Sequence, residues 1–192
     1  MPDITLASRS NEDRVAAAMT LAFATDPVER WCLPDPHQYM STFPPYVILY
    51  GGKALDYGSA YVIGDFSGVA LWLPPGVEPD YEPMTALFLR NVEESILAIA
   101  NALFEQMASF HPEEPHWYLS LMGVDPAYQG LRYGTSLLRH ALAVCDRDKM
   151  PAYLEATSPA NLSLYERHGF KTLGRIESQN SPPMFPMFRA AR

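Results

Sequence analysis

The chain has 192 residues, of which 48% are hydrophobic, a fraction typical of a folded domain and too high for a disordered chain. The formal net charge of −8 argues against a nucleic-acid partner, which usually needs a basic face, but is compatible with a cationic amine. The N-terminal residues lack the basic start and apolar run of a signal peptide, and no window approaches the roughly 20 apolar residues of a membrane span. We therefore expect one domain over residues 1–192, in a cytoplasmic protein without a membrane partner.

The two cysteines, Cys32 and Cys145, lie far apart and lack the spacing of metal ligands. Cys145 falls on the apolar face of a predicted helix, so we expect a buried thiol. The sequence predicts neither a disulfide framework nor a metal site.

The N-terminal segment predicts a short strand over 3–8, followed by a helix that Ser10 or Asn11 can cap. The next segment, 26–38, contains three prolines. Because proline cannot donate to a helical hydrogen bond, we expect irregular chain there, with an exposed Trp31.

Further along, a second helix is expected to end near Gly51, and residues 59–63 and 68–73 predict a β-hairpin. A long helical region is expected from about 85 to 110. Its apolar residues recur at helical spacing, which we interpret as core or lid packing rather than a cofactor site. They are Ile96, Leu97, Ala100, Leu103, Phe104 and Met107.

The second half alternates strands with helices. Residues 116–124 predict an apolar strand, and the expected helix after it has one apolar face. The remaining expected elements are that helix at 133–149, a strand at 152–156, a short helix at 161–168 stopped by Gly169, and strands at 171–175 and 184–189. This order predicts an α/β (α+β) domain with a mixed sheet and a parallel strand pair within 116–156.

The turn QGLRYG, between the strand at 116–124 and the helix at 133–149, carries the clearest chemical signal. Gly130 and Gly134 permit positive φ or close backbone approach, which exposes main-chain N–H groups at the helix start. These donors and the positive end of the helix dipole form an anion site suited to a pyrophosphate. The turn is neither a P-loop nor a dinucleotide-binding fingerprint, and its physics alone does not identify the anion.

Two stretches resemble the motifs of the GNAT acetyltransferases. The turn is similar to motif A, which holds the CoA pyrophosphate, except that Arg132 replaces the usual middle glycine. PAYLEATSPANLSLYERHGF is similar to motif B. Within the family, the resemblance is to puromycin N-acetyltransferases, strongest over 111–170. It implies a GNAT-type, mostly antiparallel twisted sheet flanked by helices, with the parallel pair at the acyl-CoA site.

The resemblance also implies how acetyl-CoA is bound. Main-chain groups of the strand before the turn would pair with the pantetheine arm, the turn would hold the phosphates, and Asn161 would hydrogen-bond the arm. Asn161 could instead cap a helix. The cofactor-binding residues implied are Met122, Gly123, Val124, Gln129, Gly130, Leu131, Arg132, Tyr133, Gly134, Thr135 and Asn161. For Arg132 we expect ordinary right-handed backbone and either a phosphate contact or a solvated side chain.

Two residues are candidates for proton transfer. Tyr165 matches the motif B tyrosine, and the resemblance implies that it is the general acid, although a core tyrosine is the alternative. Glu155 lies in an apolar strand, where a carboxylate must either pair with a cation or sit in a cleft with a raised pKa suited to a base. The resemblance implies the base, acting directly or through water.

Other side chains carry weaker expectations. His168 is expected to cap a helix end or to lie on the surface, and a substrate role for His111 and His116 has no support in the sequence. The aromatic residues Trp31, Trp72 and Tyr81 could line an acceptor pocket, but each is more typical of core or hinge packing.

The sequence thus predicts an acetyl-CoA-dependent N-acetyltransferase, without a metal, that acts on a small-molecule amine. A protein or peptide N-acetyltransferase and a non-catalytic CoA-binding module remain the alternatives. The oligomeric state is open, with a homodimer as one alternative.

Overall fold

The computed structural model describes residues 2–192, which form one seven-stranded sheet in the order β1-β2-β3-β4-β5-β7-β6. Neighbouring strands are antiparallel except β4 and β5, which are parallel. The predicted mixed, mostly antiparallel sheet with one parallel pair is therefore confirmed. The strands are β1 (Ile4–Leu6), β2 (Ala60–Ile63), β3 (Gly68–Leu73), β4 (Trp117–Val124), β5 (Ala152–Ala156), β6 (Lys171–Thr172) and β7 (Phe185–Arg189).

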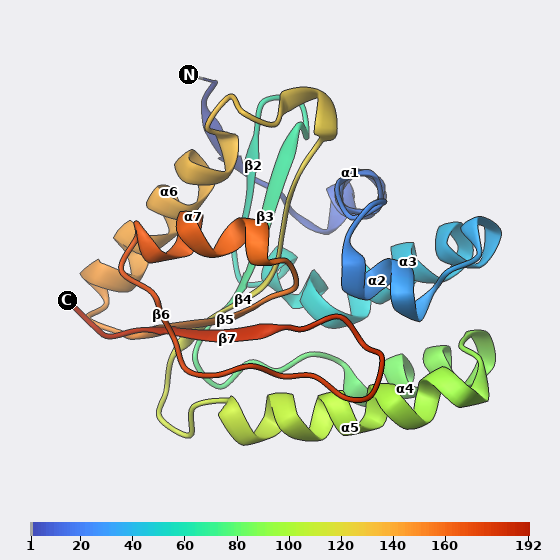
Figure 1. The fold of residues 1–192 in the computed structure, drawn as a ribbon. Helices are drawn as coiled ribbons and strands as arrows, with labels where there is room; N and C mark the ends of the chain where they lie inside the picture. Colours follow the sequence, from blue (N-terminus) through green and yellow to red (C-terminus); the bar gives the residue numbers. More distant parts are fainter. Residues whose placement is uncertain (1) are drawn as a thin grey trace.

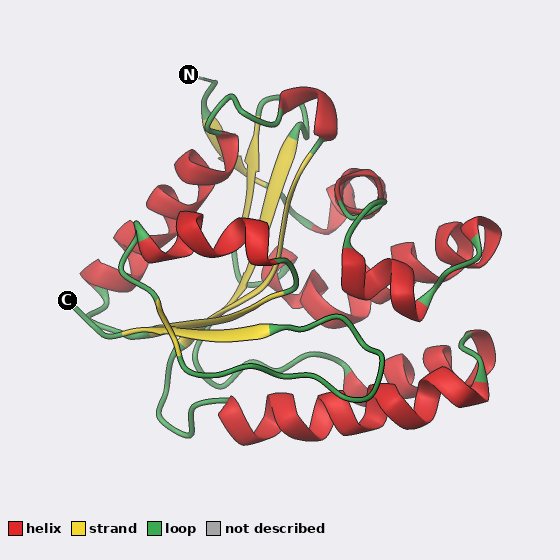
Figure 2. Cartoon of the chain, viewed as in Figure 1, coloured by secondary structure: helices red, strands yellow, loops and turns green. Residues whose placement is uncertain are grey.

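Helices surround this sheet (Figure 1, Figure 2). The α-helices are α1 (Glu12–Ala22), α2 (Pro27–Cys32), α3 (Pro36–Gly51), α4 (Tyr81–Asn91), α5 (Glu94–Phe110), α6 (Tyr133–Arg147) and α7 (Leu162–Glu166). Short 3₁₀ turns are η1 (Arg9–Asn11), η2 (Gly52–Leu55), η3 (Pro126–Tyr128) and η4 (Pro159–Asn161). Within the described chain, no helix has the length and apolar character that crossing a membrane would need.

The strands divide their side chains between two cores because successive residues point to opposite faces of a sheet. On β3, Val69 and Leu71 pack with α1 and α3, whereas Ala70 and Trp72 pack with α6 and α7. The sheet is therefore the middle layer between α1 and α3 on one face and α6 and α7 on the other.

A third, smaller core fixes α5 against the C-terminal part of the chain. Leu103 of α5 packs with Ile176 and Met184, in the segment that leads from β6 to β7. The Gln106 side-chain amide donates to the backbone carbonyl of Glu177 at 3.0 Å. In Figure 1 this red segment runs beside α5, so the helix is held near the end of the sheet where β5 finishes.

The segment 26–38 is not irregular, contrary to expectation. It contains α2 and the first turn of α3, each begun by an aspartate cap followed by a proline. Asp26 and Asp35 accept hydrogen bonds from the first helical N–H groups, while Pro27 and Pro36 occupy the one helical position that needs no N–H donor. These prolines therefore begin helices, and Trp31 is partly buried.

The other elements agree with the sequence apart from their limits. The hairpin, the helix end at Gly51 and the left-handed stop at Gly169 are confirmed. The single helical region expected over 85–110 is two helices, because the chain turns extended at Val92 and Glu93. The strand expected over 171–175 ends at Thr172.

Candidate active site

The two parallel strands separate after a short paired stretch. Trp117 and Tyr118 of β4 pair with Ala152 and Tyr153 of β5, and no further pair is recorded between the described residues of these strands. Both strands nevertheless continue, β4 as far as Val124. The main-chain groups along the later part of β4 that face β5 are thus left for another partner.

An irregularity in the neighbouring pair explains why β4 diverges. Leu71 of β3 pairs with Leu121, but the next residue, Trp72, pairs with Leu119, so Ser120 has no counterpart in the register. Its hydroxyl donates to the Leu71 carbonyl at 3.1 Å. One extra residue bends a strand and increases its twist, which directs β4 away from β5.

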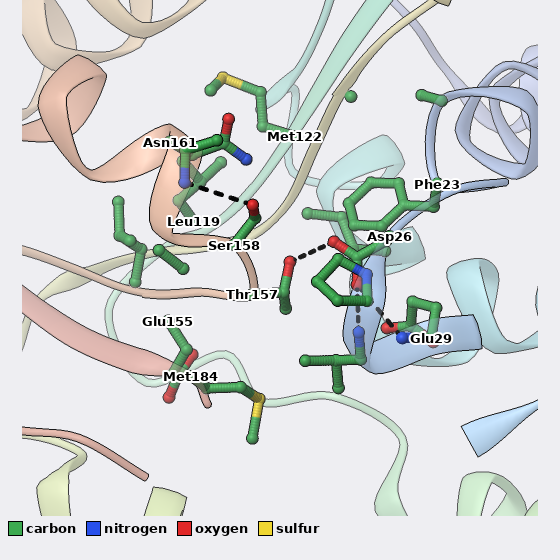
Figure 3. A pocket seen from close by; sticks show the side chains of 18 of the residues that line it. Phe23, Asp26, Glu29, Leu119, Met122, Glu155, Thr157, Ser158, Asn161 and Met184 are labelled. Carbon is green, nitrogen blue, oxygen red and sulfur yellow. Dashed lines mark hydrogen bonds between the residues drawn. The ribbon is translucent and has the colours of Figure 1, made fainter. Parts of the chain in front are cut away.

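A cavity of about 680 Å³ fills the space between the separated strands (Figure 3). One side of the cavity is formed by β4, the end of β5, the turn that precedes α6, and helix α7. The other side is formed by α2, α3 and α5. Most of the predicted site residues line it, namely Met122, Gly123, Val124, Gln129, Gly130, Arg132, Tyr133, Gly134, Thr135, Glu155, Asn161 and Tyr165. The exception is Leu131, whose side chain is 55% exposed and lies outside the cavity lining.

The turn before α6 has two residues in the left-handed region. Gly130 has φ of 79°, as the glycine predicted, and Arg132 has φ of 65° and ψ of 20°. The expectation of right-handed backbone at Arg132 is therefore wrong. Arg132 is the N-cap of α6, and it takes there the conformation that the missing middle glycine would adopt easily, at a cost of about 1 kcal/mol.

The first turn of α6 presents free donors to the cavity. No acceptor among the described residues bonds the backbone N–H groups of Tyr133, Gly134 or Thr135, and no side chain caps the helix. A Cβ added at Gly134 would come no closer than 3.6 Å to a protein atom, in Leu164, so the fold itself does not require glycine there. The bare backbone leaves room on the cavity side, and the donors form an anion site.

Glu155 is a buried carboxylate on the opposite side of the cavity. Tyr118 donates a hydrogen bond to its Oε2 at 2.7 Å, and Tyr50 is hydrogen-bonded to Tyr118 in turn. Burial raises the pKa of Glu155 to about 7, although Tyr118 and Tyr153 oppose that rise. The Tyr153 hydroxyl faces the carboxylate without a hydrogen bond of normal geometry. Glu155 is thus poised to exchange a proton near neutral pH.

Two histidines lie in a row behind Glu155. His116 Nδ1 is 2.8 Å from the Glu114 carbonyl, and its Nε2 is 3.1 Å from Nε2 of His111. A carbonyl can only accept, so neutral His116 carries its proton on Nδ1 and accepts the Nε2 proton of His111. His111 therefore presents an unprotonated Nδ1, 4.0 Å from Glu155 Oε1.

This row does not form an ion pair with Glu155. Burial and the neighbouring His116 lower the pKa of His111 to about 4, so the imidazole is neutral whenever the carboxyl is ionised. Within residues 2–192, no lysine or arginine pairs with Glu155. Glu155 thus has no permanently charged partner among the described residues, and its role as a base stays a prediction.

Tyr165 approaches the cavity from the other face of the sheet. It packs in the core of α6 and α7, whereas Tyr118 and Tyr153, beside Glu155, belong to the core of α1 and α3. Burial, and secondarily Asp26, raise the pKa of Tyr165, so its phenol remains protonated and can donate. The separated strands thus bring a protonated phenol and a titratable carboxyl group to one cavity from opposite faces of the sheet.

The remaining candidates are distributed between the site and the rest of the fold. Asn161 occupies the N-cap position of α7, but its side chain makes no capping hydrogen bond and the residue lines the cavity. Trp31 lines the cavity, but Trp72 is fully buried in the core. His168 is bonded through Nδ1 to the Leu164 carbonyl at 2.8 Å, as expected for a helix end.

A second cavity of about 480 Å³ adjoins the first. Tyr50, Phe104 and Glu155 line both, and α4 with α5 form the outer wall of the second. Tyr81 faces this cavity, as does His111. The stripe on α5, interpreted from the sequence as packing, therefore also forms part of the site wall.

Sequence reasoning missed Asp26 and Glu29, which line the first cavity from α2. The Asp-Pro pair at 26–27, read as a helix start instead of a break, would have indicated that α2 exists. No local pattern indicates that its side chains line the same cavity as Glu155, because that depends on how α2 packs.

Comparisons with known proteins agree with this geometry. Residues 69–170 match the Acetyltransferase (GNAT) family. An uncharacterized N-acetyltransferase of Schizosaccharomyces pombe is 28% identical in a 126-residue alignment that covers 59% of this chain and 51% of that protein, so the match spans about half of the curated relative.

Two solved structures share the fold along the whole chain. One, described as histone acetyltransferase HPA2 and related acetyltransferase from Corynebacterium glutamicum, is 26% identical with a TM-score of 0.72 over 100% of this chain and 97% of that one. The other, arylalkylamine N-acetyltransferase 2 from Aedes aegypti, is 15% identical with a TM-score of 0.69 over 99% of both chains.

Proposed function

Because the chain belongs to the GNAT family of acetyltransferases, we propose that it transfers an acetyl group from acetyl-CoA to the amine of a small molecule. The observation that carries this proposal is the cavity between β4 and β5. Along one continuous surface it has an anion site at α6, a protonated phenol at Tyr165 and a titratable carboxylate at Glu155.

The anion site would bind the CoA pyrophosphate. The N–H groups of Tyr133, Gly134 and Thr135 are directed to the cavity, and Arg132 adds a positive charge at its rim. From there the pantetheine arm would extend along the unpaired edge of β4 at Met122–Val124, with Asn161 across from it. The thioester would then lie between Glu155 and Tyr165.

Transfer needs a neutral amine and a proton for the departing thiolate. Glu155 would accept a proton from the ammonium group, directly or through one water. The amine nitrogen then attacks the thioester carbonyl carbon, a C–N bond forms, and the C–S bond breaks. Tyr165 donates its proton to the sulfur. The nitrogen loses its second proton as the amide forms, and this proton restores the Tyr165 phenol directly or through water, so only the proton on Glu155 remains to be released to solvent.

The wall on the Glu155 side favours a small acceptor over a protein. Aromatic residues of α3, α4 and α5, among them Tyr46, Tyr50, Phe88 and Phe104, enclose the cavity. A protein acceptor would instead need an open groove in which an extended peptide could pair through its backbone. The adjoining second cavity offers the space for the rest of a small substrate.

A thiol-release assay tests the proposal. We would mix the purified protein with acetyl-CoA and a panel of small amines, and include a histone-tail peptide because one structural relative is described as a histone acetyltransferase. Turnover of small amines, but not of the peptide, is expected. Turnover of the peptide alone would replace the acceptor class, and acetyl-CoA binding without any turnover would instead favour a non-catalytic module.

A further inference from the structure

The cavity contains a second pair of carboxylates that the proposed transfer does not use. Asp26 caps α2, accepts hydrogen bonds from the N–H groups of Val28 and Glu29, and accepts one from the Thr157 hydroxyl at the end of β5. Glu29 follows one turn later and is only 8% exposed. Figure 3 shows both residues on the side of the cavity facing Glu155.

Unlike Asp26, Glu29 has no partner for its carboxylate. None of the hydrogen bonds or ion pairs recorded within residues 2–192 involves its side-chain oxygens, although the residue lines the cavity. The nearby Arg30 is engaged elsewhere, with its guanidinium over the Tyr39 ring and bonded to the Pro34 carbonyl. A buried carboxyl group without a partner either stays protonated or, when it is ionised, is paired with a cation.

The surroundings of Glu29 favour an organic cation. Burial, and then the charge of Asp26, raise the pKa of Glu29 to about 8, and a bound ammonium group would relieve both effects. Trp31 and Tyr46 line the same cavity, and aromatic rings stabilise ammonium groups bound over their faces.

Glu29 also belongs to the same space as the proposed base. Glu29, Tyr46 and Glu155 all line the first cavity. Tyr46 comes from α3, on the Glu155 side of the sheet. An acceptor bound beside Tyr46 can therefore meet Glu155 with one end and Glu29 with the other.

We propose that Glu29, supported by Asp26, binds a second cationic group of the acceptor, so that the preferred substrates are diamines. The nitrogen at Glu155 loses its proton and is acetylated, while the nitrogen at Glu29 stays charged and positions the molecule. This inference rests on the proposed function and adds the substrate class. The net charge of −8 also favours the capture of a dication.

Matched substrates test the inference without any variant. We would measure kcat and KM for unbranched diamines of increasing length and for the monoamines of equal length. At the best length, kcat/KM for the diamine should exceed that of its monoamine by about tenfold or more, the effect expected of one charge-assisted hydrogen bond. Equal values at every length would overturn the diamine inference, while acetylation of the monoamines would still support the proposed function.

The Glu29→Gln variant then locates the effect. It should reduce the diamine-to-monoamine ratio of kcat/KM by about tenfold, chiefly through KM, because one charge-assisted hydrogen bond is lost. Glu94→Gln, on the exposed start of α5, is the matched control. A loss of kcat that is equal for both amines would mean that Glu29 moves a proton instead, which would overturn the inference.

A binding measurement separates the two proposals if no amine is acetylated. We would titrate the same diamine into the CoA-bound protein by calorimetry, with wild type and Glu29→Gln side by side. Binding that depends on Glu29, without turnover, would sustain the cation site and overturn the proposed function. Equal binding to both proteins would overturn the cation site.

Discussion

The two sides of the cavity differ in the groups that form them, mainly main-chain groups on one side and side chains on the other. On the α6 and α7 side, main-chain N–H groups, a left-handed turn and one phenol form the site, and most of it lies in two short stretches of sequence. On the α1–α5 side, the site consists of side chains from several elements, among them Glu29, Tyr46, Phe104 and Glu155. The first side suits a ligand common to a whole family, and the second can change with the substrate.

This difference explains what the sequence could predict. The glycine at 130 and the motif around Tyr165 are local patterns, so the sequence predicts an anion site and a phenol at these positions, and both residues line the cavity. Glu155 is also predicted as a site residue, because an unpaired carboxylate in an apolar strand is costly to bury. Leu131 belongs to the same turn in the sequence, but it lies outside the cavity lining. The prediction of right-handed backbone at Arg132 is wrong, because φ at this position of the turn is 65°.

The acceptor side could not be predicted in the same way. Its residues meet only through packing: α2 is held by the Asp26–Thr157 contact, and α5 by the segment before β7. Neither contact has a local signature in the sequence. The fold class followed from the order of elements, but the helix boundaries at 26–38 and 91–94 did not. The narrower resemblance to puromycin N-acetyltransferases stays a prediction.

The largest expected effect comes from the base on the acceptor side. Glu155→Gln should lower kcat/KM by roughly 100-fold or more, the usual contribution of a general base. Wild-type activity should rise with pH through about 7, because Glu155 accepts a proton only when ionised and burial raises its pKa to about 7. This ionisation should disappear from the pH–rate profile of the variant. If it persists unchanged, another group is the base.

On the cofactor side, Tyr165→Phe should lower kcat by about 100-fold, since it removes only the proton donor. The Kd for acetyl-CoA, measured by calorimetry, should stay within about twofold of wild type, because the phosphate site is made by backbone. Tyr57→Phe serves as the control, since Tyr57 is 59% exposed and lines neither cavity. Unchanged turnover would remove Tyr165 from the mechanism.

The pH dependence of folding stability should report on Glu29, on the acceptor side of the cavity. The pKa of Glu29 is raised to about 8 in the folded protein, above its value in the unfolded chain, so the folded state loses stability as pH rises from about 4.5 to about 8. Glu29→Gln removes this loss. Its Tm should therefore exceed that of wild type by several degrees at about pH 9 and by little at about pH 4.5. An equal gain at both pH values would contradict the burial of a titrating carboxylate.

The smallest effect is expected at the rim of the phosphate site. Arg132→Ala should raise the Kd for acetyl-CoA about two- to fivefold, as for an exposed ion pair, and weaken its dependence on salt. Arg139→Ala, on the exposed side of α6, is the control. Unchanged affinity and salt dependence would show that Arg132 does not contact phosphate.

The separation of β4 and β5 also has a mechanical consequence. Two pairs of residues join β1-β2-β3-β4 to β5-β7-β6 at this point, so the sheet consists of two plates that share a short seam. A ligand that bonds β4 along one side and reaches β5 and α7 on the other spans the gap that the ladder leaves open. The binding free energy of such a ligand would therefore add to the stability of the folded protein, because the ligand connects the two halves of the sheet.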